Sequence, residues 1–189
     1  RLAAEGVRYT NAFATTPVCA PGRSTLITGC WATEIGSMHM RTGKPSNAAL
    51  SRNAEAYAGI PNYEAVPPPA VRCFPELLRA RGWYCTNRSK TDYQFVAPAT
   101  TWDRSGGRAH WRGRPDPEQP FFAVFNLGVT HESGTFPARK PTAKTCDPAT
   151  VTVPPYLPDT ATTRADIART YDNIAALDRQ VGGLLSELE

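Results

Sequence analysis

The sequence predicts an α/β protein with a mostly parallel, helix-flanked sheet, because strand-like and helix-like segments alternate along the chain. The stretch FFAVFNLGV, residues 121–129, is a continuous apolar run, typical of a parallel strand buried on both faces. From Thr163 onward, apolar residues recur at spacings of three and four, which predicts an amphipathic helix. A chain of 189 residues can bury one core and is near the size of a single domain.

Local signals predict the other elements in chain order. Residues 2–5 have a helical pattern, and the alternation of residues 7–13 predicts a strand. Residues 73–81 predict a helix and residues 83–87 a strand. Residues 41–70, rich in Pro, Asn, Ser and Gly, and residues 91–119 are predicted to be long loops. Helical patterns at both ends lead us to expect a fragment of a longer protein.

Composition narrows the kinds of partner. Twenty-one Lys and Arg against 17 Asp and Glu give a net charge of +4 with no basic run, which disfavours nucleic acid and suits a small anionic substrate. No apolar stretch approaches the roughly 18 residues of a membrane-spanning helix. The five cysteines include no C-x-x-C pair, which argues against a zinc site and against a complete disulfide framework.

The stretch CAPGRSTLITG, residues 19–29, places a cysteine just before a predicted short helix. A proline two residues on suits the first turn, and the closing glycine suits the helix end. Free N–H groups of the first turn, with Arg23 one turn further on, would make the position of Cys19 favourable for an anion. A buried structural cysteine and a thiolate nucleophile of the cysteine-phosphatase type are both open. The phosphatase pattern is disfavoured, because it places its arginine where this chain has Thr25.

CAPGRSTLITG resembles the signature of the formylglycine-dependent (type I) sulfatases of the alkaline phosphatase-like superfamily, C-x-P-x-R followed by Thr-Gly. Five fixed positions make a chance match on the order of one in ten thousand. The resemblance implies that a formylglycine-generating or anaerobic sulfatase-maturating enzyme oxidises Cys19 to formylglycine. One hydroxyl of the hydrated aldehyde then attacks sulfur, and the other expels sulfate. Gly22 departs from the pattern, since many members carry Ser there.

Three more segments resemble sulfatases. LAAEGVRYTNA, residues 2–12, is similar to the helix and strand that precede the signature. SKTDYQF, residues 89–95, resembles the segment with the sulfate-binding lysine, which implies that role for Lys90. PFFAVFNLGVTHES, residues 120–133, resembles the strand that delivers an active-site histidine, which implies His131. Both residues follow predicted strands, and ligands bind at the carboxyl edge of a parallel sheet.

The resemblance implies a role for each candidate. Arg23 and Lys90 would stabilise negative charge on the sulfate, and His131 would contact sulfate or protonate the departing alcohol. His39 and His110 lie in predicted loops that can border the pocket, and for each of them a substrate contact and a plain loop role are both open. Many relatives have a histidine two residues after the lysine, where this chain has Asp92, a weak candidate.

The resemblance also implies a calcium ion held by carboxylates and by formylglycine at position 19. No dense cluster of Asp or Glu occurs in the sequence, so we expect the other ligands to lie outside this chain. Residues 1–189 would then be part of an N-terminal catalytic domain, inactive alone. The predicted function is hydrolysis of sulfate from a sulfated carbohydrate, with a looser likeness to a bacterial heparan N-sulfatase-like branch and an expected periplasmic or extracellular location.

Two other functions remain open from the sequence. One is a phosphonate monoester or phosphodiester hydrolase of the same superfamily. The other is a non-catalytic sulfoglycan-binding relative that keeps the anion pocket without the chemistry.

Overall fold

The computed structural model describes residues 2–40, 55, 59, 63–136 and 143–189. The chain forms two compact units, Arg1–Phe125 and Asn126–Glu189, and each is described by itself. Most of the predicted loop at residues 41–70 lies outside the described residues. In the described part of the chain, no helix is both long and apolar enough to cross a membrane.

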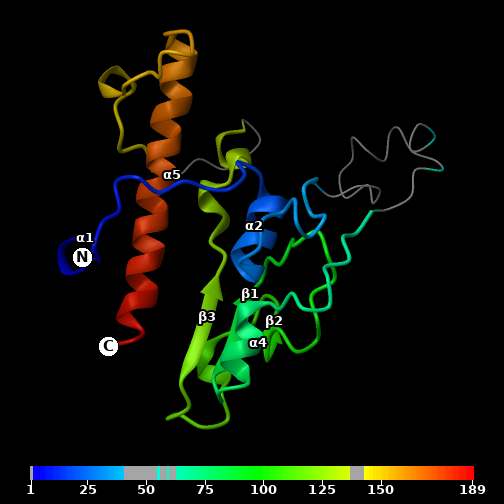
Figure 1. The fold of residues 1–189 in the computed structure, drawn as a ribbon. Helices are drawn as coiled ribbons and strands as arrows, with labels where there is room; N and C mark the ends of the chain where they lie inside the picture. Colours follow the sequence, from blue (N-terminus) through cyan, green and yellow to red (C-terminus); the bar gives the residue numbers. More distant parts are fainter. Residues whose placement is uncertain (1, 41–54, 56–58, 60–62, 137–142) are drawn as a thin grey trace. The chain divides into compact units, whose positions relative to one another are not determined.

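The first unit contains a three-stranded, all-parallel sheet, which confirms the α/β class (Figure 1). The central strand β1 (Tyr84–Arg88) lies between β2 (Arg104–Ser105) and β3 (Phe121–Phe125). Thr86 pairs with Arg104 on one side and with Ala123 on the other. Because all three strands run in the same direction, the loops that follow them leave from one edge of the sheet.

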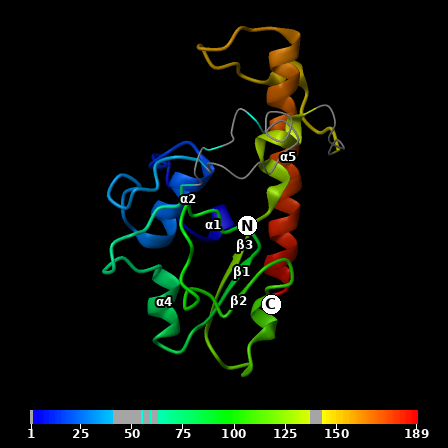
Figure 2. The same ribbon diagram turned by 90° about the vertical axis from the view of Figure 1, so that its right-hand side faces the viewer.

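The described residues of this unit form the α-helices α1 (Leu2–Glu5), α2 (Cys19–Thr28) and α4 (Phe74–Arg79). Figure 2 shows α2 and α4 on the same side of the sheet. The first turn of α4 carries a capping box, in which the Cys73 N–H donates to Glu76 Oε2 at 2.9 Å. Helix α2 ends at Gly29, whose φ of 71° is left-handed and whose N–H donates to the carbonyl of Thr25 at 2.8 Å.

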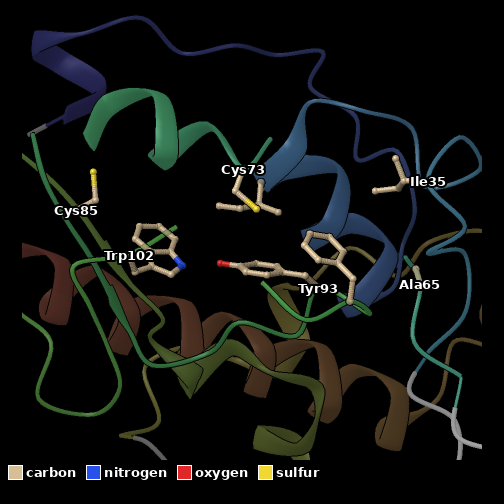
Figure 3. Close-up of a cluster of buried hydrophobic side chains, with 8 residues drawn as sticks. Ile35, Ala65, Cys73, Cys85, Tyr93 and Trp102 are labelled. Carbon is tan, nitrogen blue, oxygen red and sulfur yellow. The ribbon is translucent and has the colours of Figure 1, made fainter. Parts of the chain in front are cut away.

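A cluster of buried side chains joins α2 and α4 to β1 and to the segment between β1 and β2 (Figure 3). The indole of Trp102 faces the phenol of Tyr93 in this cluster and stacks on Phe122, with ring centroids 6.2 Å apart. Burial, followed by the nearby carboxylate of Asp103, raises the pKa of the Cys85 thiol to about 11. The buried members are Ile27, Ile35, Ala65, Cys73, Cys85, Tyr93, Phe95 and Trp102.

The second unit is built on the long helix α5 (Ala161–Ser186). Three short 3₁₀ helices pack against α5: η2 (Gly128–Thr130), η3 (Glu132–Thr135) and η4 (Pro148–Thr150). Thr160 caps the N-terminus of α5, since its hydroxyl accepts a hydrogen bond from the Thr163 N–H at 3.1 Å. The helix therefore begins before Thr163, the start predicted from the sequence.

Three other predictions are wrong in detail. Residues 7–13 form no strand, and the side chains of Val7, Tyr9 and Phe13 are 80, 80 and 89% exposed. An alternating pattern forms a strand only beside a pairing partner, and the described residues offer none there. The predicted loop at residues 91–119 contains β2, and β3 ends at Phe125 with all its residues half-buried. The helices predicted at residues 2–5 and 73–81 and the strand at 83–87 are confirmed, with small shifts in their ends.

Candidate active site

Cys19 is the first residue of α2 and its side chain is half-buried. The helix was expected to begin just after this residue. The first turn of α2 has fewer free backbone N–H groups than the sequence suggested. Pro21 has no N–H, and the Ala20 N–H donates to Met40 Sδ at 3.5 Å. None of the five cysteines forms a disulfide, so the thiol of Cys19 is free.

Arg23 lies one turn further along α2 and reaches the loop after β1. Its Nε donates to the carbonyl oxygen of Thr91 at 2.7 Å, and its Nη2 donates to the carbonyl oxygen of Lys90. The guanidinium carbon also lies 6.0 Å from the centre of the Tyr93 ring. A guanidinium has five N–H donors, so others stay available for an anion. The structure thus places the two predicted cationic residues next to each other, because the side chain of Arg23 binds the backbone of Lys90.

Lys90 forms an ion pair with Asp92, in which Nζ and Oδ2 are 3.4 Å apart. The lysine side chain is 36% exposed and the aspartate side chain only 8%. Asp92 has a φ of 55°, so the chain turns back there and brings the carboxylate to the ammonium group. This residue, a weak candidate from the sequence, is a direct neighbour of the predicted sulfate-binding lysine.

Sequence reasoning missed Asn87, which connects this loop to β2. Its side chain is fully buried in β1, and Nδ2 donates to the Lys90 carbonyl at 3.2 Å and to Ser105 Oγ at 3.1 Å. An amide in the middle of a buried strand needs hydrogen-bond partners. The polar Thr-Asn pair inside the predicted strand WYCTN, residues 83–87, was the signal that could have identified it.

The two histidines of the first unit, His39 and His110, lie in separate surroundings. His39 is exposed and packs on Tyr63, with ring centroids 4.7 Å apart. His110 is half-buried, with its ring 4.0 Å from that of Trp111, and its Nδ1 accepts a hydrogen bond from the Arg112 N–H at 3.2 Å. His110 follows β2 and therefore lies in a loop at the carboxyl edge of the sheet.

His131 belongs to the second unit, between η2 and η3, and its side chain is exposed. Its Nδ1 accepts a hydrogen bond from the Ser133 N–H at 3.2 Å and lies 2.9 Å from Ser133 Oγ. Arg169 of α5 fixes the same segment by donating to the carbonyl of Gly134 at 3.2 and 3.0 Å. Both of these contacts to Ser133 are made by Nδ1, so the ring is oriented through that atom.

The described residues do not fit a calcium ion. In residues 2–40, 55, 59, 63–136 and 143–189, no three His, Cys, Asp or Glu side chains are grouped so that they could hold a metal. A hard cation of this kind takes six to eight oxygen ligands, several of them carboxylates.

Helix α2 and the loop after β1 define the class of protein. A parallel α/β sheet that presents arginine and lysine at its carboxyl edge is suited to hydrolases of anionic esters. No model of a known protein family matches the chain.

Individual relatives make the assignment specific. The chain is 41% identical over 224 aligned residues to the ulvan-active sulfatase of Formosa agariphila, with the whole chain aligned. A second protein of that organism, named sulfatase, is 31% identical over 64% of the chain. Human N-acetylgalactosamine-6-sulfatase is 33% identical over 44% of the chain. The chain belongs to the sulfatase family, and it spans 36, 21 and 14% of the lengths of these three relatives.

Proposed function

We propose that the protein that carries this chain is a sulfuric ester hydrolase that removes sulfate from a sulfated carbohydrate, with Cys19 oxidised to formylglycine. The observation that carries this proposal is the signature CAPGRSTLITG on helix α2. Cys19 stands at the start of that helix, and the arginine of the signature is hydrogen-bonded to the loop of the predicted sulfate-binding lysine. The hydrated aldehyde at position 19 would supply the nucleophile.

The other proposed residues act on charge and protons. Arg23 and Lys90 bind the sulfate oxygens and stabilise the negative charge that develops in the transition state. His131 contacts sulfate or donates a proton to the leaving alcohol, and the hydrogen bonds at its Nδ1 support Nε2 as the donating atom. His39 and His110 contact the carbohydrate.

The names of the relatives support a class of substrate. Identity to the ulvan-active sulfatase extends over the whole chain, whereas identity to N-acetylgalactosamine-6-sulfatase covers less than half of it. We therefore propose a sulfated polysaccharide of the ulvan type as the substrate. A polysaccharide substrate favours a periplasmic or extracellular enzyme, which is part of the proposal.

The proposal includes a maturation partner, either a formylglycine-generating enzyme or an anaerobic sulfatase-maturating enzyme. Expression with such an enzyme should convert the thiol of Cys19 into an aldehyde, detectable as a change in mass of the peptide that contains it. An unmodified cysteine in that peptide would contradict the formylglycine mechanism. We expect calcium ligands to come from outside the 189 residues and the chain alone to be inactive.

Turnover by the full-length protein is the direct test. Cys19→Ala should abolish hydrolysis of an aryl sulfate, and Cys30→Ala, which removes a half-buried thiol two residues after α2, serves as the matched control. Near-normal hydrolysis by Cys19→Ala would overturn the proposal. Faster turnover of an aryl phosphonate than of the aryl sulfate would assign the phosphonate hydrolase function instead. Sulfoglycan binding without any turnover would assign the binding-only function.

A further inference from the structure

The loop after β2 carries positive charge that the proposed sulfate site does not use. Residues 104–112, RSGGRAHWR, contain three arginines and no carboxylate. Residues 103–109 line an open, polar hollow of about 470 Å³. Arg104 and Arg108 are exposed at this hollow, and in the described part of the chain neither takes part in an ion pair.

The one carboxylate at the hollow is already neutralised. Asp103 Oδ1 accepts from Arg79 Nε at 2.9 Å and lies 2.8 Å from Arg79 Nη2. Its other oxygen, Oδ2, accepts from the Cys85 N–H at 2.7 Å. The lining therefore keeps the net positive charge of its two arginines, and in water-accessible surroundings such a pair attracts an anion.

The backbone of this loop is fixed while the guanidinium groups are exposed. The Gly106 N–H donates to the Asn87 carbonyl at 2.9 Å, and the Ala109 N–H donates to the Gly106 carbonyl at 3.0 Å. The loop is anchored at its end by Ala109 and Trp111, which are 4 and 6% exposed. An anion that binds here would order two side chains without ordering the backbone, which lowers the entropy cost of binding.

The hollow lies at the same edge of the sheet as the Lys90 loop. Strands β1 and β2 are parallel neighbours, so the residues that follow them start about 5 Å apart. The buried amide of Asn87 bridges the two segments, donating to the Lys90 carbonyl and to Ser105 Oγ. The loop at residues 104–109 is therefore within reach of a carbohydrate whose sulfate lies at Lys90.

We propose that Arg104 and Arg108 form a subsite for a second anionic group of the substrate, a sulfate or a carboxylate on a sugar next to the sulfate that is cleaved. This inference rests on the proposed function, because it assumes a sulfated carbohydrate at Lys90. The subsite selects polyanionic chains over substrates with a single charge.

The first test uses the full-length protein and two substrates, an aryl sulfate with one negative charge and an ulvan oligosaccharide with at least two sulfates. The double variant Arg104→Ala/Arg108→Ala should have a lower kcat/KM for the oligosaccharide relative to its kcat/KM for the aryl sulfate, by about ten-fold or more. Each substitution removes a charge-assisted hydrogen bond to the second anionic group. The loss should lie in KM and should shrink at high salt. Arg81→Ala is the matched control, because this exposed arginine precedes β1 at the opposite edge of the sheet.

A second pair of variants keeps both arginines. A Cβ at Gly107 would meet no atom within 4 Å, so a side chain fits there. Gly107→Glu should weaken oligosaccharide binding several-fold by repulsion, while Gly107→Gln, of nearly the same shape, should not. A loss that is equal in the two variants would indicate a steric effect and overturn the subsite.

Direct binding separates failure of the subsite from failure of the proposed function. Calorimetry with the Cys19→Ala protein measures affinity for the oligosaccharide without turnover. Unchanged affinity in the double arginine variant overturns the subsite, while hydrolysis of the aryl sulfate by the Cys19-containing protein still supports the proposed function. Weaker affinity supports the subsite even where no sulfate ester is hydrolysed. The oligosaccharide can also be used with its own carboxylates reduced to alcohols. The double arginine variant then loses no affinity if a carboxylate is the bound group, and still loses affinity if a sulfate is.

Discussion

The guanidinium group of Arg23 is hydrogen-bonded to the carbonyl oxygen of Lys90, so helix α2 is fixed to the loop after β1 by the arginine of the signature itself. A second hydrogen bond runs from Nε to the Thr91 carbonyl at 2.7 Å, so one guanidinium group binds two consecutive carbonyl oxygens of the loop. Arg23 therefore has two roles that depend on its planar shape: it holds the lysine loop, and it keeps further donors for an anion.

Arg23→Lys tests this double role, because it preserves the positive charge and removes the planar guanidinium group. An ammonium group cannot reproduce two divergent hydrogen bonds from one plane, so kcat/KM for an aryl sulfate should fall about ten-fold or more. Hydrogen exchange in residues 89–95 should become faster in the same variant. Arg81→Lys, on an exposed arginine before β1, is the control. Normal exchange and turnover in Arg23→Lys would show that charge alone is sufficient.

The ion pair between Lys90 and Asp92 predicts the effect of charge removal. Asp92→Asn keeps the shape of the side chain and suits the φ of 55°, since Asn adopts left-handed conformations readily. Without a carboxylate 3.4 Å from the ammonium group, inorganic sulfate should bind about three- to ten-fold more tightly. Calorimetric titration with sulfate measures this change. Weaker sulfate binding would show instead that Asp92 is needed to position Lys90.

The parallel sheet and the C-terminal end of α2 could be predicted from the sequence because local signals were strong. Gly29 follows an apolar segment, and FFAVF has the apolar character of a sheet strand. The two-residue strand β2 could not be predicted, because its residues, Arg104 and Ser105, have no β propensity and pair only because β1 is beside them. The strand predicted at residues 7–13 failed for the opposite reason, since its pattern has no neighbour in the described residues.

The candidate site divides in the same way. Cys19 and Arg23 became candidates through the signature at residues 19–29, and Lys90 through the likeness of residues 89–95, and both are local patterns in the sequence. Asn87 and the pairing of Asp92 with Lys90 depend on contacts across a loop and a strand, which spacing does not reveal. Whether each proposed residue takes part in the reaction stays a prediction.

Asp172 predicts a pH dependence in the second unit. Burial alone would raise its pKa, but hydrogen bonds from the N–H groups of Thr145 and Cys146 and from the Thr145 hydroxyl, with the charge of Arg169, hold the pKa below its ordinary value of 3.8. Because the pKa is lower in the folded state, the stabilisation is complete above pH 3.8 and is lost as the pH falls through the folded pKa.

Hydrogen exchange of residues 145–146 measures this stabilisation. After correction for intrinsic rates, their protection should be constant above pH 3.8 and should fall below it. Asp172→Asn should speed their exchange about ten-fold or more at neutral pH and should flatten the acid dependence, because it removes a charged acceptor. Asp178→Asn changes an exposed aspartate of the same helix and should have little effect. A wild-type profile that is flat through the acid range would contradict the assigned role of Asp172.

Gly134 predicts how tightly the segment that carries His131 must pack. A Cβ at Gly134 would lie 2.8 Å from the Val129 carbonyl oxygen and 2.9 Å from Asn173 Nδ2, closer than real side-chain carbons approach. The Gly134 N–H also donates to the His131 carbonyl at 2.7 Å, so displacement at Gly134 moves the histidine. Gly134→Ala should cost about 1–3 kcal/mol of stability from overpacking.

Gly128→Ala is the matched control for this change, because it lies in the same segment and its Cβ would meet nothing within 4 Å. Thermal unfolding should give a lower Tm for Gly134→Ala alone, and hydrogen exchange in residues 128–136 should be faster in that variant alone. If His131 takes part in the reaction as proposed, kcat should also fall in Gly134→Ala, since a proton donor must be held within hydrogen-bond reach of the leaving group. Two alanine variants with the same Tm, exchange and kcat would mean that the segment relaxes freely and does not fix His131.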